Sequence, residues 1–226
     1  MRTIVLGLQQ SGTSMFAGLC NEAGWKSPTP HHGSRPYPAW ENKQLFELNK
    51  EILRTASENP IPGWVWHPDR SGYRVTEDHR ATAIKLLDKF DDQFDKWTFK
   101  NPESSLTYHL LWHEFEWDHV VVCYCDPLMW IPDVKRDHIP GRIRILPEID
   151  DALQRVWIEV MNNLLKIEEA IFVRFPTDAD EFFHFMGGKG KPKTFKPNWV
   201  PKEHKVPDWA RSTWLSLEER SIRQTV

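Results

Sequence analysis

The chain of 226 residues is long enough to bury about 70% of its unfolded surface in a single domain. Its formal net charge of −3 argues against nonspecific binding to nucleic acid. No signal peptide precedes Thr3 and no apolar run approaches the ~20 residues of a membrane helix, so we expect a cytoplasmic protein with no nucleic-acid or membrane partner.

The charge is unevenly distributed along the chain. Residues 187–226 hold nine Lys or Arg against four Asp or Glu, which makes this segment about +5 and the rest about −8. We expect residues 1–188 to form the main α/β domain. Residues 189–226 are expected to form a basic tail that packs on that domain or extends from it.

Three cysteines, Cys20, Cys123 and Cys125, all lie inside apolar segments. None belongs to a CxxC motif or has a histidine at metal-ligand spacing. They are therefore interpreted as reduced core residues and not as disulfides or zinc ligands.

The first elements are a strand, a glycine-bounded turn and a helix. The run Thr3–Leu6 is typical of a buried parallel strand, and apolar residues at helical spacing follow from Thr13 to a predicted stop at Gly24. The turn between them matches the phosphate-loop pattern GxxxxGK[ST] except that Thr13 replaces the lysine. Such a loop gathers backbone N–H groups and the hydroxyls of Ser11, Thr13 and Ser14 at a helix N-terminus, which favours a phosphate or sulfate. The alternative is an ordinary βα turn that binds nothing.

Further elements follow in chain order. The proline-rich residues 26–39 predict a loop, residues 41–56 a helix, and residues 59–73 an irregular aromatic segment. Thr76 is expected to cap a helix that runs to Phe94 with Ala81, Ile84, Leu87, Phe90 and Phe94 on its buried face. The acidic residues of that helix alternate with lysines and predict a solvated face instead of a metal site.

The second half alternates between strands and helices. Strands are predicted at residues 97–100, 120–124 and 170–175, and helices at about 104–115, 150–168 and after Asp178. Residues 128–147 contain three prolines and are predicted to form a loop that supplies positive charge.

Two blocks of sequence resemble the sulfotransferase family. The segment Gln9–Ser14 is similar to the family's loop P-[KR]-S-G-T-[ST], and Lys100-Asn101-Pro102 with the later VVVCYCDP is similar to its K-x-P and h-h-h-h-R-[DN]-P blocks. Gln10 and Cys125 stand where the family has basic residues. The resemblance implies an α/β fold, a P-loop NTPase-like three-layer sandwich with a central parallel sheet.

The resemblance also implies a function and a set of site residues. It implies sulfuryl transfer from 3′-phosphoadenosine 5′-phosphosulfate (PAPS), without a metal, to a small-molecule or glycan acceptor. The donor would contact residues of the two blocks, namely Gly7, Gln9, Gln10, Ser11, Gly12, Thr13, Ser14, Cys125 and Asp126.

Four residues are candidates for the chemistry. Lys100 follows a strand expected beside the first one and would stabilise developing charge, and Glu41 is the first candidate base. His31 and His32 are the alternative bases, since a loop histidine titrates near neutral pH. Tryptophans at positions 64, 66 and 130 hint at a sugar or aromatic acceptor, although core packing explains tryptophans more often.

Two other functions remain open. One is a sulfotransferase-fold protein that binds a nucleotide or partner without transfer, because both family cations are replaced. The other is a P-loop kinase or nucleotidase, which Thr13 and the lack of a convincing Walker B aspartate disfavour.

Overall fold

A central sheet of four parallel strands organises the protein. The computed structural model describes residues 1–226 except 29, 32–39, 56–71, 140–146, 194–204 and 223–226. The strands lie in the order β4-β1-β5-β6 and comprise β1 Arg2–Gly7, β4 Trp97–Lys100, β5 His119–Tyr124 and β6 Ile171–Arg174. A separate antiparallel pair consists of β2 Pro30–His31 and β3 Glu41–Asn42.

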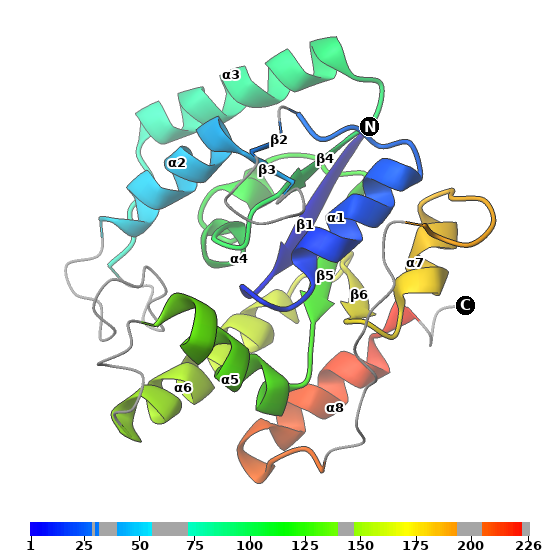
Figure 1. Ribbon diagram of the computed structural model, residues 1–226. Coiled ribbons are helices and arrows are strands. Elements are labelled where there is room, and N and C mark those ends of the chain that lie inside the picture. Colours follow the sequence, from blue (N-terminus) through cyan, green and yellow to red (C-terminus); the bar gives the residue numbers. More distant parts are fainter. Residues whose placement is uncertain (29, 32–39, 56–71, 140–146, 194–204, 223–226) are drawn as a thin grey trace.

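Helices cover both faces of the central sheet. Because side chains alternate along a strand, Val5 packs toward one face and Ile4 toward the other. The first face is covered by α1 Thr13–Glu22 and α7 Ala179–Phe185, and Figure 1 shows α1 lying along β1. The other core contains residues of α2 Lys43–Leu53, α3 Glu77–Gln93, α4 Ser104–Thr107, α5 Pro127–His138, α6 Pro147–Leu164 and α8 Arg211–Glu219. The predicted α/β class with a central parallel sheet is confirmed.

The strand register places the candidate residues at one edge. Lys100 lies beside Val5, and Gly7 lies beside Cys123. Since the strands are parallel, the segments that follow β1, β4, β5 and β6 all meet at the carboxyl edge. Ligand sites of open α/β sheets form at this edge.

Several predicted elements are confirmed with small shifts of their ends. The helix α1 begins at Thr13, and Gly24 beyond its end has the predicted left-handed conformation with φ of +93°. The side chain of Thr76 caps α3 by accepting a hydrogen bond from His79 N at 3.3 Å. The buried face of α3 was partly mispredicted, because Ile84 is 49% exposed while Ala83 is fully buried.

The predicted loop at 128–147 is wrong over its first half, which forms α5. Pro127 occupies the first helical position, where no N–H partner is needed, and Asp126 caps the helix by accepting from Leu128 N at 2.8 Å. Trp130 and Val134, four residues apart, are buried. Their packing compensates for Pro132 inside the helix.

Other predicted boundaries also differ from the structure. Glu41 precedes α2 and lies in β3, and Asn42 is the helix cap. The helix predicted from 104 to 115 ends at Thr107 and is followed by a 3₁₀ turn at Trp112–Glu114. Asp178 accepts from Arg174 N and Ser221 Oγ and makes no cap bond to α7.

The C-terminal part of the chain contributes to the core. A 3₁₀ turn at Asp208–Ala210 leads into α8, whose Trp214 and Leu217 are buried. Tyr124 at the end of β5 stacks edge-on with Trp214 and donates to Glu218 Oε1 at 2.9 Å. This segment is basic in composition, but it includes an amphipathic helix.

Candidate anion-binding site

The turn between β1 and α1 has the form of an anion-binding loop. Gln10 and Gly12 are left-handed, with φ of 64° and 91°, which turns the chain sharply into α1. Gly12 is the N-cap residue and supplies no side-chain acceptor to the first-turn amides of the helix. Ser14 in this first turn is partly exposed. This end of α1 therefore presents amide and hydroxyl donors at the positive end of a helix dipole.

Contacts from several elements hold the loop in shape. Ser11 uses both its N–H and its hydroxyl to donate to Leu8 O, at 3.1 and 2.6 Å. Gly7 N donates to Ser105 Oγ at 2.7 Å, and the same hydroxyl donates to Gly7 O at 3.0 Å. Trp130 Nε1 donates to Gln9 O at 2.6 Å. The Ser11 hydroxyl is thus committed to the turn, and Trp130 acts as a buried support for the loop.

Lys100 and Glu41, which were predicted as separate site residues, form an ion pair. Lys100 Nζ donates to Glu41 Oε1 at 2.5 Å, and the two side chains are 3% and 18% exposed. Lys100 ends β4 and lies next to Val5 in the sheet, while Glu41 comes from β3. The structure therefore joins two candidate residues that are 59 positions apart in the chain.

A buried carboxyl group, Glu103, was missed by sequence reasoning. It is 4% exposed, and it accepts from Asn101 Nδ2 at 2.8 Å and from Gln9 Nε2 at 3.3 Å. Burial raises the pKa of Glu103, and the neighbouring charge of Glu41 raises it further while Lys100 opposes the shift. Its position directly after Lys100-Asn101-Pro102 was the only signal in the sequence. The contacts show that it connects the loop to the end of β4.

Gln10 and Cys125, which stand where the sulfotransferase pattern has basic residues, carry no positive charge. Gln10 Nε2 donates to Asp137 Oδ2 at 3.0 Å and lies 3.1 Å from His138 Nε2, both at the end of α5. Cys125 is buried, its thiol points to Gln10 O at 3.8 Å, and burial raises its pKa, so it is an uncharged core residue. Asp126 is engaged as the cap of α5.

The cations of α5 are paired with carboxylates. Lys135 bonds to Asp150 at 2.7 Å, and Arg136 bonds to Asp133 and Asp137 at 2.7 and 2.8 Å. The predicted supply of positive charge from this region is therefore not seen within α5. Arg142 and Arg144 lie outside the described residues.

Some predicted site residues cannot be placed. His32, Trp64 and Trp66 lie outside the described residues, and only the backbone of His31 is described, as part of β2. Within the described ranges, no group of three or more His, Cys, Asp or Glu residues could hold a metal ion. In the same part of the chain, every helix is too short or too polar to cross a membrane.

Comparison with known proteins identifies one similar architecture. No family model and no curated protein matches the sequence. The sulfotransferase domain from the Synechococcus PCC 7002 olefin synthase superposes with a TM-score of 0.51 at 12% identity, over 96% of this chain and 94% of that one. This protein has a sulfotransferase-like fold. At this identity the similarity extends to the fold alone, and the loop and the Lys100–Glu41 pair must be argued on their own chemistry.

Proposed function

We propose that this protein is a sulfotransferase that moves a sulfuryl group from PAPS to a hydroxyl or amine of a small-molecule or glycan acceptor. The observation that carries the proposal is the Lys100–Glu41 pair beside the anion-binding loop, at the carboxyl edge of a sulfotransferase-like sheet. A cation and a carboxylate at this position fit a reaction that needs both charge stabilisation and proton removal.

The residues present suit an oxyanion on the loop side. Gly12 leaves the first-turn amides of α1 without a side-chain cap, and Ser14 adds a partly exposed hydroxyl. Lys100 carries three N–H donors, of which Glu41 takes one. The ammonium can therefore contact a bound phosphosulfate while it still orients the carboxylate.

The proposed step assigns a role to each of these groups. PAPS would supply a sulfuryl group bonded to a phosphate leaving group. The loop amides and Ser14 would hold the anionic end of the donor, and Lys100 would stabilise charge on the bridging oxygen as the sulfur–oxygen bond breaks. Glu41 would accept the proton of the acceptor hydroxyl while the hydroxyl oxygen bonds to sulfur. The donor would leave as adenosine 3′,5′-bisphosphate. His32 stays the alternative base.

A second candidate is a protein that binds the nucleotide without transferring sulfate. It is favoured by the uncharged side chains of Gln10 and Cys125, which stand where the sulfotransferase pattern has basic residues. Each missing charge-assisted contact would weaken donor binding by about 1.5–3 kcal/mol.

Calorimetry and a transfer assay distinguish these functions. We expect adenosine 3′,5′-bisphosphate to bind more tightly than ATP with Mg²⁺, and Ser14→Ala to weaken this binding about fivefold or more, corresponding to about 1 kcal/mol. Ser212→Ala, at an exposed position on α8, is the matched control. A preference for ATP with Mg²⁺ would support a kinase or nucleotidase.

The base is tested separately from the donor site. Glu41→Gln should abolish sulfate transfer from labelled PAPS to a panel of hydroxyl compounds and leave bisphosphate affinity undiminished. If wild-type protein binds the bisphosphate but transfers nothing to any acceptor, the binding-only function is the better description. If Glu41→Gln transfers at the wild-type rate, Glu41 is not the base.

A further inference from the structure

A second pocket lies along α1 on the side of the molecule that carries α7. It has a volume of about 630 Å³, and its lining includes Gly18 and Asn21 of α1, Trp40 before β3, and Lys189, Lys191 and Lys193 after α7. The floor begins at the middle of α1 and reaches its last turn. The pocket therefore extends away from the loop, which sits at the first turn of a helix about 15 Å long.

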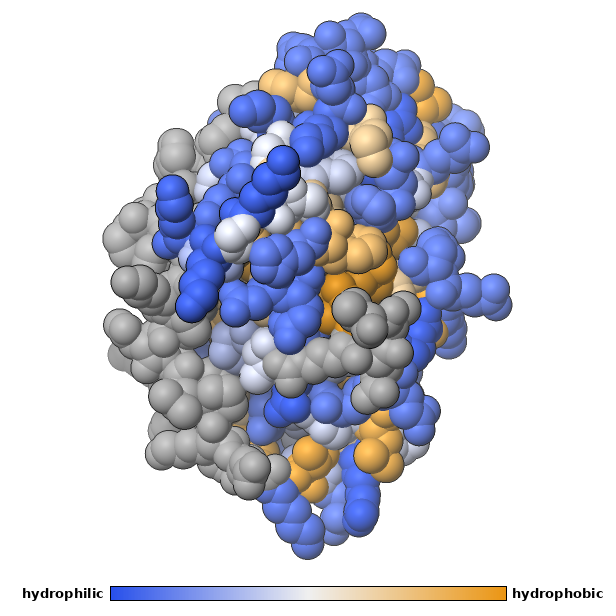
Figure 2. Space-filling model, turned by 90° about the vertical axis from the view of Figure 1, so that its right-hand side faces the viewer, coloured by the Kyte–Doolittle hydropathy of each residue, from blue (hydrophilic) through white to orange (hydrophobic). Residues whose placement is uncertain are grey.

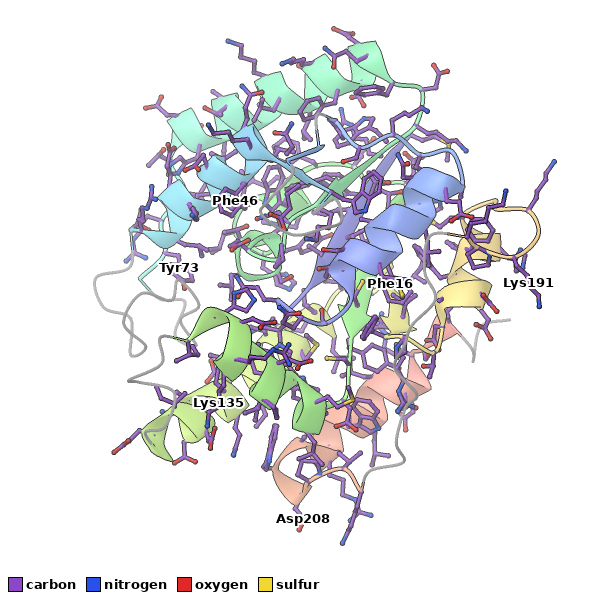
Figure 3. The ribbon with its side chains drawn as sticks, viewed as in Figure 1. Phe16, Phe46, Tyr73, Lys135, Lys191 and Asp208 are labelled. Atoms are coloured by element: carbon purple, nitrogen blue, oxygen red, sulfur yellow. The ribbon has the colours of Figure 1, made fainter. Side chains whose placement is uncertain are left out.

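Three lysines give this pocket a positive wall. They occupy every second position of a non-helical segment, and all three side chains are exposed. Within the described ranges, none of their ammonium groups pairs with a carboxylate, and Glu22 in the lining accepts the backbone N–H of Lys193 at 2.6 Å. Figure 3 shows Lys191 at the outer edge of the molecule, and Figure 2 shows hydrophilic residues around a smaller hydrophobic area on this side.

The lining also includes a tryptophan in an unusual conformation. Trp40 is partly exposed and has φ of 57°, which is rare for a bulky residue and costs on the order of 1–3 kcal/mol. Backbone strain of this kind clusters at active sites, ligand clamps and switch regions. An indole face provides a surface on which a planar or sugar ring can stack.

The tryptophan also connects the pocket to the candidate base. Trp40 is directly followed by Glu41, whose carboxylate bonds to Lys100. Consecutive Cα atoms are about 3.8 Å apart, so the backbone at Trp40 lies next to that of Glu41, although neither Glu41 nor Lys100 lines the pocket. A molecule that contacts the lysines and extends past Trp40 would therefore bring its other end toward Glu41.

We infer that this pocket holds the acceptor and selects one that carries a ring and a negatively charged group. The inference rests on the proposed sulfotransferase function. The ring stacks on Trp40, the anionic group pairs with the lysines, and the hydroxyl to be sulfated faces Glu41. Acidic sugars and aromatic acids share this chemistry, so the two sources are compared in the experiment.

The experiment measures binding of matched pairs that differ in one charged group. We expect 4-nitrophenyl β-D-glucuronide to bind about tenfold more tightly than 4-nitrophenyl β-D-glucoside, or 4-hydroxybenzoate to bind about tenfold more tightly than 4-hydroxybenzamide. Because the lysines are exposed, the preference should shrink as salt rises from 50 to 500 mM. The pair that shows the larger preference identifies the kind of ring.

Variants assign the preference to the pocket. Lys189→Gln/Lys191→Gln/Lys193→Gln should abolish it, whereas Lys85→Gln/Lys89→Gln on the exposed face of α3 should not. Trp40→Gly, which also relieves the strain of the left-handed backbone, should weaken the binding of both compounds of a matched pair by the same factor. The inference is overturned if neither anion is preferred, or if the preference survives in the triple variant.

Donor binding separates this inference from the proposed function. The triple variant should bind adenosine 3′,5′-bisphosphate as tightly as wild type, and a large loss would show that the lysines serve the donor, which also overturns the inference. If wild-type protein does not bind the bisphosphate, the proposed function fails. A lysine-dependent preference for the anionic compounds would then still establish the pocket as their binding site.

Discussion

Lys100 Nζ is hydrogen-bonded to Glu41 Oε1 at 2.5 Å, but the lysine side chain is far more deeply buried than the glutamate side chain. The lysine side chain is 3% exposed and the glutamate 18%. A buried charge that loses its partner is more costly than one that can regain water. The two members of the pair should therefore respond differently to substitution.

Glu41→Gln should destabilise the protein by about 3 kcal/mol, since it leaves the Lys100 ammonium buried without its carboxylate. Lys100→Met should cost less, about 1–2 kcal/mol, because Glu41 can turn toward solvent. Urea denaturation measures both free energies of unfolding. Equal losses would show that burial does not set the balance within this pair.

Gly12 should tolerate no side chain. A β-carbon there would lie 2.3 Å from Cδ2 of Phe175, and the φ of +91° disfavours any L-residue. Gly12→Ala should therefore destabilise the protein by about 2–4 kcal/mol and weaken bisphosphate binding. A thermal melt and calorimetry measure the two effects.

The double variant Gly12→Ala/Phe175→Ala tests the cause of that loss. It removes the two closest contacts, to Cδ2 and Cγ of Phe175, but keeps the β-carbon of residue 175 at 2.7 Å and the backbone strain. Its free energy of unfolding should therefore exceed the value obtained by adding the losses of the two single variants. Strict additivity would indicate that the ring and the added methyl group do not meet.

Glu103→Gln should change how stability depends on pH. Because burial raises the folded-state pKa of Glu103, the folded protein binds its proton more tightly than the unfolded chain does. Wild type should therefore lose stability relative to Glu103→Gln as pH rises from the ordinary glutamate pKa through the raised one, and the difference should then stay constant. Thermal melts of both proteins between pH 4 and 8 measure it.

Glu51→Gln, at an exposed position on α2, is the control for this pH series. Its stability should track wild type across the range. If the stability difference between wild type and Glu103→Gln is the same at every pH, the pKa of Glu103 does not change on unfolding.

Asn49→Ala should be strongly destabilising. The fully buried Asn49 side chain donates to Asn101 Oδ1 and Ser104 Oγ, both at 2.9 Å, and accepts from Thr107 Oγ1 and Trp112 Nε1 at 2.6 and 2.9 Å. Its removal leaves several buried polar groups with fewer partners, which should cost about 3–4 kcal/mol. Urea denaturation measures the loss.

The same variant should also affect the loop. Asn101 donates to Glu103, which accepts from Gln9, so the network reaches the candidate site. We expect weaker bisphosphate binding by Asn49→Ala even at temperatures where it stays folded. Unchanged affinity would show that the network supports the core alone. Asn21→Ala is a suitable comparison for stability, since Asn21 on α1 is partly exposed and its side chain donates to Trp25 O at 3.1 Å.

Local signals in the sequence were enough to predict several elements. Apolar β-branched runs predicted β1 and β5 because both faces of a central parallel strand are buried, and the glycine turn before Thr13 predicted the loop. The carboxyl edge also followed from the order of strands and helices. These signals depend on residues that are adjacent or one helical turn apart.

The three-dimensional fold was needed to learn which distant groups meet. It paired Lys100 with Glu41, turned the Gln10 side chain toward α5, and buried Glu103 between loop and strand. It also made a helix of the proline-rich segment that begins at Pro127, because Trp130 and Val134 find a core to pack against. Such contacts depend on packing between elements far apart in the chain, and neither residue spacing nor intrinsic propensity encodes that packing.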